Sequence, residues 1–548
     1  MPHFMTWVLE ALAKYPSRTL FKELVHPRSQ CSPSWVSISY DTFLYDLGRS
    51  AAYWIQNLTK HGVNPNDVVG LWITGVKYSD LVHIYGLARA GFVPQVLNAN
   101  ATIPIIRDLF AKTGGKVLIS EPSFVSDSVD TDKDIGSPIL FIPGDLSTLP
   151  APTCPLPNLP DVAPTDRALI FHTSGTTSGV PKPIPETHRW ITYQAQVLWA
   201  RAFHCYPDGR PLMINNIGFF ANVGSATAIT YLSWSGHSFI QTSKSDFEVD
   251  EFLAMLEEGL NALFLYAPWF SKLLTIARNN TSVLAALKGL GQINYTGAAL
   301  NPEDEIWASE QGIAVTALYA TTETSINLVS PLAEKGILPG MRVVNDGCKF
   351  IPTRGLDQND LDADSQQRSQ GGQLYDLFLP ANADTCPHAS VRNRPNGHIT
   401  GDLFEEVKPG LYCFRGRNDD WIRTGKYFAF CDTKSIEDHV LTSCADLVRN
   451  CVIVGHYKPI IVLFVESVQP ITSPADEAKF KAAILDRIAA FNTRLIFHER
   501  IEREAQIVCA PAGSLPRTRE KGNIRRKAVE DEHSMRLKEI YAGFEDKI

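Results

Sequence analysis

The sequence predicts an α/β protein whose sheets are mainly parallel. Over the first 120 residues, short apolar runs alternate with helical patterns, and similar units continue to about residue 330. Such alternation is typical of parallel strands joined through helices. The chain has 548 residues, of which 44% are hydrophobic and 20% charged, so it can bury several core-forming units.

The first elements follow this alternation in order. Apolar residues at helical spacing between residues 4 and 12 predict an amphipathic helix and not a signal peptide. Residues 67–73 predict a buried strand, residues 78–90 a helix that ends at Gly91, and residues 92–97 the next strand. The order strand–helix–strand indicates a parallel pair.

The middle of the chain is less regular. Residues 121–166 are rich in Pro, Ser and Asp and predict a long surface excursion. The apolar run 168–171 predicts a strand that leads into a Ser/Thr/Gly-rich loop. Residues 354–373 are polar throughout, which is typical of a mobile loop.

The last third of the chain changes character. Residues 374–415 carry short apolar runs between Gly and Pro turns, which predicts a small β-rich subdomain. From about residue 420 the pattern becomes that of a compact α+β unit with a basic C-terminal stretch. We therefore expect an N-terminal core at residues 1–418 and a mobile C-terminal subdomain at residues 419–548.

Composition excludes several classes of protein. A net charge of −8 and a pI near 6.0 argue against nucleic-acid binding. The sequence has no apolar run of membrane-spanning length. The ten cysteines are scattered without a CxxC pair, so we expect a reduced, cytoplasmic protein rather than a disulfide scaffold or a zinc site. We also expect a monomer.

The segment 171–182 is the most informative part of the chain. Glycines allow backbone N–H groups to face an anion, hydroxyls add donors and a lysine adds positive charge. This combination predicts a cradle for a polyphosphate, with ATP as the favoured ligand. The alternative is a solvated turn. The residues assigned to the cradle are Thr173, Ser174, Gly175, Thr176, Thr177 and Lys182.

A second candidate lies at residues 317–324, where an apolar strand leads into an aromatic residue, hydroxyls and a carboxylate. Tyr319 can stack on a purine, and Thr322 can bond to the α-phosphate. Glu323 can hold Mg²⁺, which prefers carboxylate and phosphate oxygens. The alternative is a threonine-rich turn with a capping glutamate.

Two further segments fit a nucleotide. Gly297 and Ala298 follow an apolar run, and their small size allows close approach of an adenine or an acyl group. They also suit a turn that enters a helix, and both interpretations can hold together. Asp402 suits a ribose diol, because a carboxylate accepts two hydroxyl donors. Arg417 can reach the ribose or the α-phosphate.

Together these motifs resemble the adenylate-forming superfamily, which includes acyl-CoA synthetases, luciferases and nonribosomal peptide synthetase adenylation domains. The loop is similar to TSGTTGxPK with Ser178 as an additional residue, and the second segment is similar to YGxTE with Ala320 in place of Gly. Further segments are similar to the GGAPL, TGD, GRxDD and PxTxxGKxxR motifs. The resemblance covers essentially the whole chain.

The resemblance implies roles for residues near the C-terminus. Asp419 lies in the GRxDD-like segment and is implied to be the hinge between the two domains. In the last motif the order is Lys-Gly instead of Gly-Lys, so Asn523 stands at the expected lysine position. Lys521 is the implied catalytic lysine, which contacts the acid and the α-phosphate. The alternative is a solvated basic tail.

The sequences of several segments look like those of the adenylation domain in fungal nonribosomal peptide synthetase-like carboxylic acid reductases. This resemblance implies ATP and Mg²⁺ as cofactors and a partner carrier domain whose phosphopantetheine thiol takes the acyl group before reduction. The sequence has neither an LGGDS-like segment nor a GxGxxG loop. Two alternatives remain: a stand-alone acyl- or aryl-CoA ligase, and a non-catalytic adenylate-binding module.

The resemblance also implies an acid pocket formed by Phe220, Ala221, Asn222 and Ala320. Relatives that activate amino acids carry an Asp at the Asn222 position, where it pairs with the α-ammonium. Asn cannot neutralise an ammonium by charge, but it can bond to a hydroxyl or a carboxylate. An aryl or other non-amino carboxylic acid is therefore favoured. The alternative for Asn222 is a buried side chain satisfied by the backbone.

Overall fold

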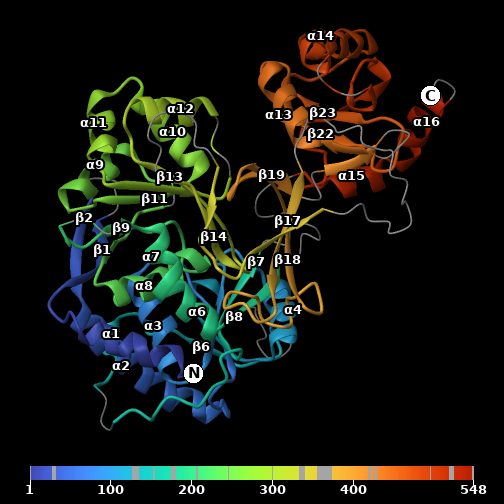
Figure 1. Cartoon of the computed structure of the whole chain (residues 1–548). Helices are drawn as coiled ribbons and strands as arrows, with labels where there is room; N and C mark the ends of the chain where they lie inside the picture. Colours follow the sequence, from blue (N-terminus) through green and yellow to red (C-terminus); the bar gives the residue numbers. More distant parts are fainter. Residues whose placement is uncertain are drawn as a thin grey trace.

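A computed structural model describes residues 2–545, with gaps. The ranges and residues outside its described part are 27–32, 126–134, 152–154, 174–180, 205, 207, 245, 299, 301, 332–339, 354–372, 418–420, 425–428, 494, 496 and 518–523. Two large sheets and a smaller antiparallel sheet form the main body, and the C-terminal elements gather in a lobe of their own (Figure 1). The α/β prediction with mainly parallel sheets is confirmed.

The first large sheet has six strands in the order β6-β5-β3-β4-β7-β8. All neighbours are parallel except β7 and β8, which form an antiparallel hairpin at one edge. The strands are β3 (Val68–Trp72), β4 (Val93–Leu97), β5 (Gly115–Ser120), β6 (Ile139–Phe141), β7 (Arg167–Thr173) and β8 (Lys182–Thr187). The predicted strands at 67–73, 92–97 and 168–171 are therefore confirmed.

The second large sheet has nine strands in the order β15-β14-β13-β12-β11-β9-β10-β1-β2. Its central pairs are parallel and both ends are antiparallel. The strands are β1 (Thr19–His26), β2 (Ser34–Ser39), β9 (Met213–Asn215), β10 (Ser238–Ile240), β11 (Ala262–Tyr266), β12 (Gln292–Thr296), β13 (Val315–Thr321), β14 (Ser325–Val329) and β15 (Arg342–Val343). The carboxyl ends of parallel β11, β12 and β13 meet at one edge, where open α/β sheets bind ligands.

Helices cover both sheets and fill the space between them. They are α1 (Phe4–Ala13), α2 (Tyr40–Leu58), α3 (Tyr78–Arg89), α4 (Ile103–Thr113), α6 (His188–Tyr193), α7 (Trp199–Ala202), α8 (Val223–Ser235), α9 (Val249–Glu257), α10 (Ala267–Ala277), α11 (Thr281–Gly289) and α12 (Pro302–Glu310). A π-helical segment, η4 (Gln194–Leu198), joins α6 to α7. The predicted helices near 4–12 and at 78–90 are confirmed as α1 and α3.

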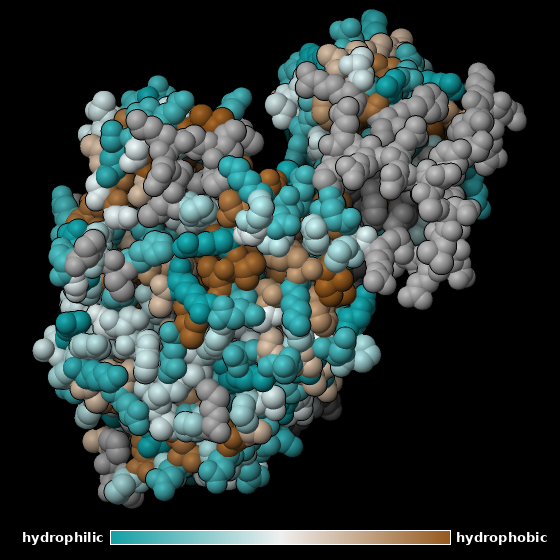
Figure 2. Space-filling view, in the orientation of Figure 1, coloured by the Kyte–Doolittle hydropathy of each residue, from teal (hydrophilic) through white to brown (hydrophobic). Residues whose placement is uncertain are grey.

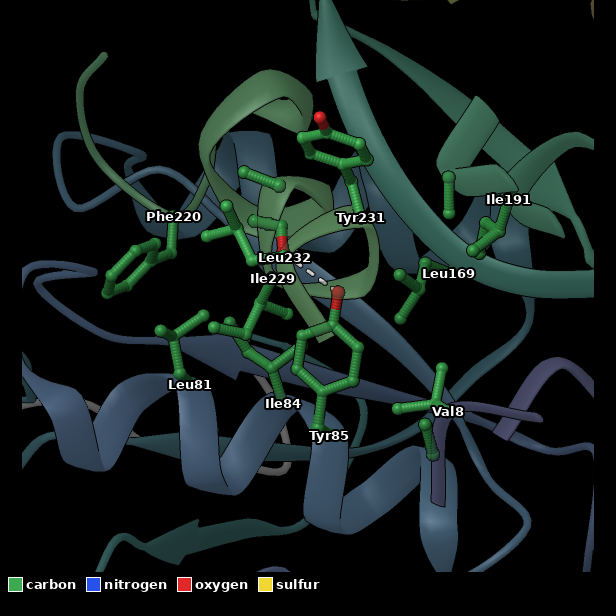
Figure 3. Close-up of a cluster of buried hydrophobic side chains, with 14 of the residues drawn as sticks. Val8, Leu81, Ile84, Tyr85, Leu169, Ile191, Phe220, Ile229, Tyr231 and Leu232 are labelled. Carbon is green, nitrogen blue, oxygen red and sulfur yellow. Dashed lines mark hydrogen bonds between the residues drawn. The ribbon is translucent and has the colours of Figure 1, made fainter. Parts of the chain in front are cut away.

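The main core lies between the two large sheets. Figure 3 shows part of it, with Leu81, Ile84 and Tyr85 of α3 facing Ile229 and Leu232 of α8. The Tyr85 hydroxyl donates a 2.8 Å hydrogen bond to a backbone carbonyl of α8, so the two helices are fixed by packing and by a buried polar contact. This contact attaches the first half of α8 to α3.

A small antiparallel sheet follows the second large sheet, as predicted from residues 374–415. Its strands are β16 (Lys349–Pro352), β17 (Leu374–Pro380), β18 (Gly397–Lys408) and β19 (Leu411–Arg417). In the orientation of Figure 1, apolar residues gather at the centre of the visible face, near β14 and this sheet (Figure 2). The region 121–166 is mostly irregular, but β6 inside it extends the six-stranded sheet.

The C-terminal lobe has the predicted α+β character. Its elements are β20 (Trp421–Thr424), β21 (Ala429–Asp432), α13 (Thr433–Ser443), β22 (Val448–Val454), β23 (Val462–Ser467), α14 (Pro474–Asn492), β24 (Ile507–Ala510), α15 (Arg526–Glu532) and α16 (Ser534–Glu545). The boundary at 418/419 stays a prediction, because residues 418–420 lie outside the described part. Throughout the described part, every helix is too short or too polar to cross a membrane.

Candidate active site

The β7–β8 hairpin carries the segment predicted to bind phosphate. Thr173 at the end of β7 pairs with Lys182 at the start of β8, and Lys182 is exposed. The hairpin therefore brings the two ends of the segment together. Ser174, Gly175, Thr176 and Thr177 lie outside the described residues, so their contacts with phosphate stay predictions.

His172 anchors this hairpin to the centre of the sheet. Its Nδ1 lies 3.0 Å from the Val96 carbonyl oxygen and its Nε2 lies 3.0 Å from Nε2 of Gln95. The Thr113 hydroxyl donates to the other amide atom of Gln95 at 2.8 Å, which leaves the Gln95 NH₂ group facing the imidazole. His172 therefore donates from Nδ1 and accepts at Nε2. Burial lowers its pKa to about 4, in agreement with this neutral form.

Glu186 is a buried carboxyl group in the phosphate hairpin. It lies in β8 opposite Leu169 and is 0% exposed. Neither of its oxygens has a hydrogen-bond partner in the part of the chain that the structure describes. Burial raises its pKa well above the usual value, and the negative charge of Glu323 raises it further. An unpaired buried carboxylate is costly, so burial favours the protonated form of Glu186.

Thr322 and Glu323 lie in the turn between β13 and β14. Thr321 pairs with Ser325 across the turn, and the Thr324 N–H donates to Oγ1 of Thr321 at 3.1 Å. The turn therefore lies at the carboxyl end of β13, with Thr322 and Glu323 half-buried. The predicted pairing of a hydroxyl and a carboxylate in one turn is present in the structure.

Tyr319 and Asp402 are joined directly. The Tyr319 hydroxyl lies 2.5 Å from Oδ2 of Asp402, and Nη1 of Arg417 lies 3.5 Å from Oδ1 of the same carboxylate. The Tyr319 ring also packs against Phe404 and Phe414, with centroids 4.9 and 6.1 Å away. The structure thus brings together three residues predicted from separate motifs. Stacking of Tyr319 on a purine stays a prediction.

Gly297 follows β12 and requires glycine for two reasons. Its φ is +88°, and a Cβ built there would lie 2.9 Å from Cδ1 of Tyr266. L side chains rarely adopt this conformation, so a substitution would be strained even before the clash. The group that lies close to the backbone at Gly297 is therefore the Tyr266 ring. Gly297 and Ala298 remain exposed at the edge of the sheet, where a ligand can reach them.

Asn222 lies at the start of α8 and has two polar partners. Its Oδ1 accepts a 2.8 Å hydrogen bond from the Gly224 N–H and so caps the helix. This contact fixes the orientation of the Asn222 amide. The NH₂ group of Asn222 donates to the Tyr266 hydroxyl oxygen. The alternative of an Asn satisfied by backbone alone is therefore only half correct, because the second partner is a side chain.

Phe220 corrects one prediction about the pocket. It is 0% exposed and packs in the main core (Figure 3), whereas the neighbouring Phe219 is 48% exposed. The Phe220 N–H is fixed to the Gly75 carbonyl oxygen at 2.7 Å. Phe220 therefore supports the pocket from the core side and offers no surface to an acid. Ala221 is half-buried and Ala320 is exposed, as a pocket lining requires.

Tyr266 is a candidate pocket residue that the sequence analysis missed. It is the last residue of β11 and pairs with Thr296, next to Gly297. The only signal in the sequence was its position at the end of an apolar run, immediately before Ala267 and Pro268. The same position also suits an ordinary helix start, because Pro is common in the first helical turn.

The lysine proposed for catalysis lies outside the described residues, as does the hinge candidate Asp419. The chain around Lys521 is anchored on the side that is described. Arg517 contacts both carboxylate oxygens of Glu466, at 3.0 and 2.5 Å, and Glu466 is 0% exposed. A bidentate pair of this kind fixes geometry well, so the start of the lysine segment is attached firmly to β23.

The described residues contain no group of three His, Cys, Asp or Glu side chains that could hold a metal ion by themselves. Mg²⁺ is usually held by one or two carboxylates together with substrate phosphates and waters. Glu323, which is half-buried in its turn, fits that arrangement.

Two known family models match most of the chain. A family model described as AMP-binding enzyme matches residues 9–349. A second, described as AMP-binding enzyme C-terminal domain, matches residues 431–545. The first match includes the phosphate segment, the turn with Glu323 and the start of α8.

Curated relatives include fungal proteins. The AMP-binding domain-containing enzyme iboA of Amanita muscaria is 30% identical over 93% of this chain and 98% of its own length. The adenylate-forming reductases stbB of Stachybotrys bisbyi and Nps11 of Serpula lacrymans are 24% and 23% identical over 84% and 94% of this chain. The chain spans only 41% and 47% of those two reductases.

Solved structures share the fold. ATP-bound MatB from Rhodopseudomonas palustris has a TM-score of 0.70 at 17% identity and covers 96% of this chain, with 98% of its own length matched. A benzoate CoA ligase from Burkholderia xenovorans has a TM-score of 0.67 at 16% identity, with 96% of this chain and 100% of that one matched. At these identities the likeness establishes the fold.

Proposed function

This chain belongs to the AMP-binding enzyme family and is an adenylate-forming, ligase-type enzyme; from that premise we propose that it activates a small carboxylic acid with ATP. A carboxylate oxygen of the acid attacks the α-phosphorus, and the bond from that phosphorus to the bridging oxygen breaks. The products are an acyl-adenylate and pyrophosphate. The main task of the protein is to hold two anions in line and to screen their repulsion.

The observation that carries this proposal is the Tyr319–Asp402 hydrogen bond of 2.5 Å. It attaches the carboxylate that suits a ribose diol to β13, the strand that leads into the turn with Thr322 and Glu323. Ribose and α-phosphate are neighbours in ATP, so their proposed binding groups must be neighbours too. Arg417, beside Asp402, adds positive charge where the α-phosphate lies next to the ribose.

The β- and γ-phosphates are assigned to the hairpin segment. Lys182 lies exposed at its end, opposite Thr173, and its ammonium can stay with the pyrophosphate as it leaves. Glu323 would hold Mg²⁺, which supplies charge neutralisation of the phosphates when bound. Thr322 donates its hydroxyl to the α-phosphate, and Lys521 is assigned to the oxygens that gain charge during attack.

The acid is assigned to the edge formed by Asn222, Tyr266 and Ala320. Neither polar side chain there carries a negative charge, so an α-ammonium finds no partner in this pair. The Asn222 amide and the Tyr266 hydroxyl instead suit oxygen-containing groups. We therefore propose an aryl or other non-amino carboxylic acid as the substrate.

We propose that the acyl group then passes to the phosphopantetheine thiol of a carrier domain, for later reduction. The thiol sulfur attacks the acyl carbon, the thiol proton is lost, and AMP leaves. The two adenylate-forming reductases among the relatives support this acceptor. Free coenzyme A is the second candidate, because the chain is also similar to a 4-chlorobenzoate–CoA ligase of Arthrobacter, which is 28% identical over 48% of this chain. Rotation near Asp419 would expose the adenylate to either thiol.

Pyrophosphate exchange with a panel of acids tests the first half-reaction. We expect exchange with at least one aromatic or simple carboxylic acid and with no α-amino acid. Lys521→Ala should lower exchange strongly with ATP affinity preserved, and Asn523→Ala should do much less. If Asn523→Ala is the more damaging change, the lysine assignment is wrong. Absence of exchange with every acid would favour a non-catalytic adenylate-binding module.

Product analysis tests the acceptor. Without a carrier, the adenylate should stay bound and turnover should stall near one product per enzyme. Addition of a phosphopantetheinylated carrier should restart it. Rapid formation of acyl-CoA with free coenzyme A would instead establish a stand-alone ligase and leave the adenylation chemistry unchanged.

A further inference from the structure

The turn that holds Glu323 closes on a strained residue. Ser325 has a φ of +63°, in the left-handed region that non-glycine residues seldom occupy. It directly follows the turn, opposite Thr321. Such strain persists only where surrounding contacts hold it, and it is frequent at functional sites.

A buried hydrogen-bond chain holds Ser325 in this conformation. The Ser325 hydroxyl donates to Oε1 of Gln194 at 3.1 Å, and Nε2 of Gln194 donates to Oγ1 of Thr227 at 2.7 Å. The Thr227 hydroxyl in turn donates to the Val223 carbonyl oxygen at 2.6 Å. Each of these groups donates to the next residue in the series, so the three hydrogen bonds run in one direction from Ser325 to Val223. The three linking side chains are all buried.

The chain connects two parts of the proposed site. At one end is the Glu323 turn, and at the other is the first turn of α8, next to Asn222. Gln194 is the first residue of the π-helical segment that interrupts the helix between α6 and α7. Such π-helical segments occur frequently at functional sites, because they redirect side chains locally.

Glu323 needs such an anchor because its neighbour is another acid. Glu186 is 0% exposed, and neither of its oxygens has a hydrogen-bond partner among the described residues. The turn that carries Glu323 is a short connection between β13 and β14, and its carboxylate would shift if no side chain fixed it. The link from Ser325 to Gln194 opposes that shift through a neutral contact.

We propose that Gln194 and Ser325 are positioning residues that hold the Glu323 carboxylate where a divalent cation on ATP can reach it. This inference rests on the proposed adenylation function. Neither residue needs to touch ATP or the acid. Their loss should raise the Mg²⁺ concentration that nucleotide binding requires and should leave the fold intact.

Ser325→Gly is the decisive variant. Glycine accepts a φ of +63° without strain, so the variant removes the hydroxyl and leaves the backbone unstrained. Relief of the backbone strain offsets the donor that the buried Gln194 Oε1 loses, so the melting temperature should stay close to that of the wild type. The Mg²⁺ concentration for half-maximal ATP binding, measured by calorimetry without any acid, should rise about three- to tenfold, as expected for one lost hydrogen bond. ATP binding in EDTA should not change.

Gln194→Met is the second variant, and Gln292→Met is its matched control. Both glutamines are 3% exposed. Gln292 bonds to the Ala202 carbonyl oxygen at 2.6 Å and to Asn294 at 2.8 Å, away from the Glu323 turn. Both variants should lower the melting temperature, but only Gln194→Met should raise the Mg²⁺ requirement.

An unchanged Mg²⁺ requirement in a fully folded Ser325→Gly protein would overturn the inference. So would an equal rise in Gln194→Met and Gln292→Met, since that result would indicate a general loss of stability. Failure of the proposed function is distinguishable, because the wild-type protein would then show no pyrophosphate exchange with any acid.

Discussion

The hydroxyl of Tyr319 and the carboxylate of Asp402 lie 2.5 Å apart although 83 residues separate them in the chain. The contact joins β13 of the nine-stranded sheet to β18 of the small antiparallel sheet. Asp402 is only 5% exposed, so its charge depends on Tyr319 and Arg417 for compensation. One hydrogen bond therefore fixes the proposed ribose-binding group relative to the proposed phosphate-binding turn.

Tyr319→Phe tests this relationship. The ring keeps its packing against Phe404 and Phe414, but the buried carboxylate loses a donor, at a cost of about 1–3 kcal/mol in the free energy of unfolding. We expect a lower melting temperature and about tenfold weaker AMP binding by calorimetry. Binding of 2′,3′-dideoxy-AMP should change much less, because it lacks the ribose diol. Equal weakening for both nucleotides would remove Asp402 from the ribose.

Tyr266→Phe tests the acid pocket. The Asn222 NH₂ group donates to the Tyr266 oxygen, so the hydroxyl hydrogen of Tyr266 points elsewhere and no described residue accepts it. We expect it to bond to an oxygen on the acid. The variant should raise KM for hydroxylated or dicarboxylic acids about three- to tenfold, with kcat nearly constant. Acids without such an oxygen serve as the control, and a uniform KM increase would count against the assignment.

The sequence predicted the strands better than it predicted contacts between them. Apolar runs ending in Thr, Gly or Glu marked β7 and β13 correctly, because a buried strand and its turn are local features. The Tyr319–Asp402 and Asn222–Tyr266 contacts join residues far apart, and no local pattern contains them. Phe220 was misassigned because the sequence does not show which of two adjacent aromatic residues faces the core.

The sequence also did not indicate which polar residues are buried. Glu186 lies in a strand where side chains alternate between faces, so a charged residue there suggests exposure. The sequence around His172 does not indicate that its imidazole bonds to the Val96 carbonyl oxygen and to the Gln95 side chain, both in β4. Gln194 belongs to a helix whose π-helical geometry is not visible in its apolar spacing. These side chains depend on tertiary packing, which overrides local propensity.

His172 should make the protein sensitive to acid. Its pKa is about 4 in the folded protein against an ordinary value of 6.5. The neutral form is therefore the folded form, and stability is fully present above pH 6.5 and falls as pH decreases from 6.5 toward 4. His172→Gln should abolish this part of the slope in a melting-temperature series from pH 7.5 to 5. His61→Gln, at an exposed position, should leave the slope as it is in the wild type.

Glu186 should have the opposite dependence on pH. Burial and the charge of Glu323 raise its pKa well above the ordinary 4.5, so folding takes up a proton at pH values above 4.5. The folded state is favoured fully below pH 4.5, and this contribution is lost as pH rises toward the folded pKa, at about 1.4 kcal/mol per pH unit.

Glu186→Gln cannot titrate. The empty variant should therefore be more stable than the wild type at pH 8, and their melting temperatures should converge near pH 5. The isosteric amide keeps the volume of the side chain, so packing is nearly unchanged. A constant difference between the two proteins across that range would mean that Glu186 has a partner in solution and is ionised there.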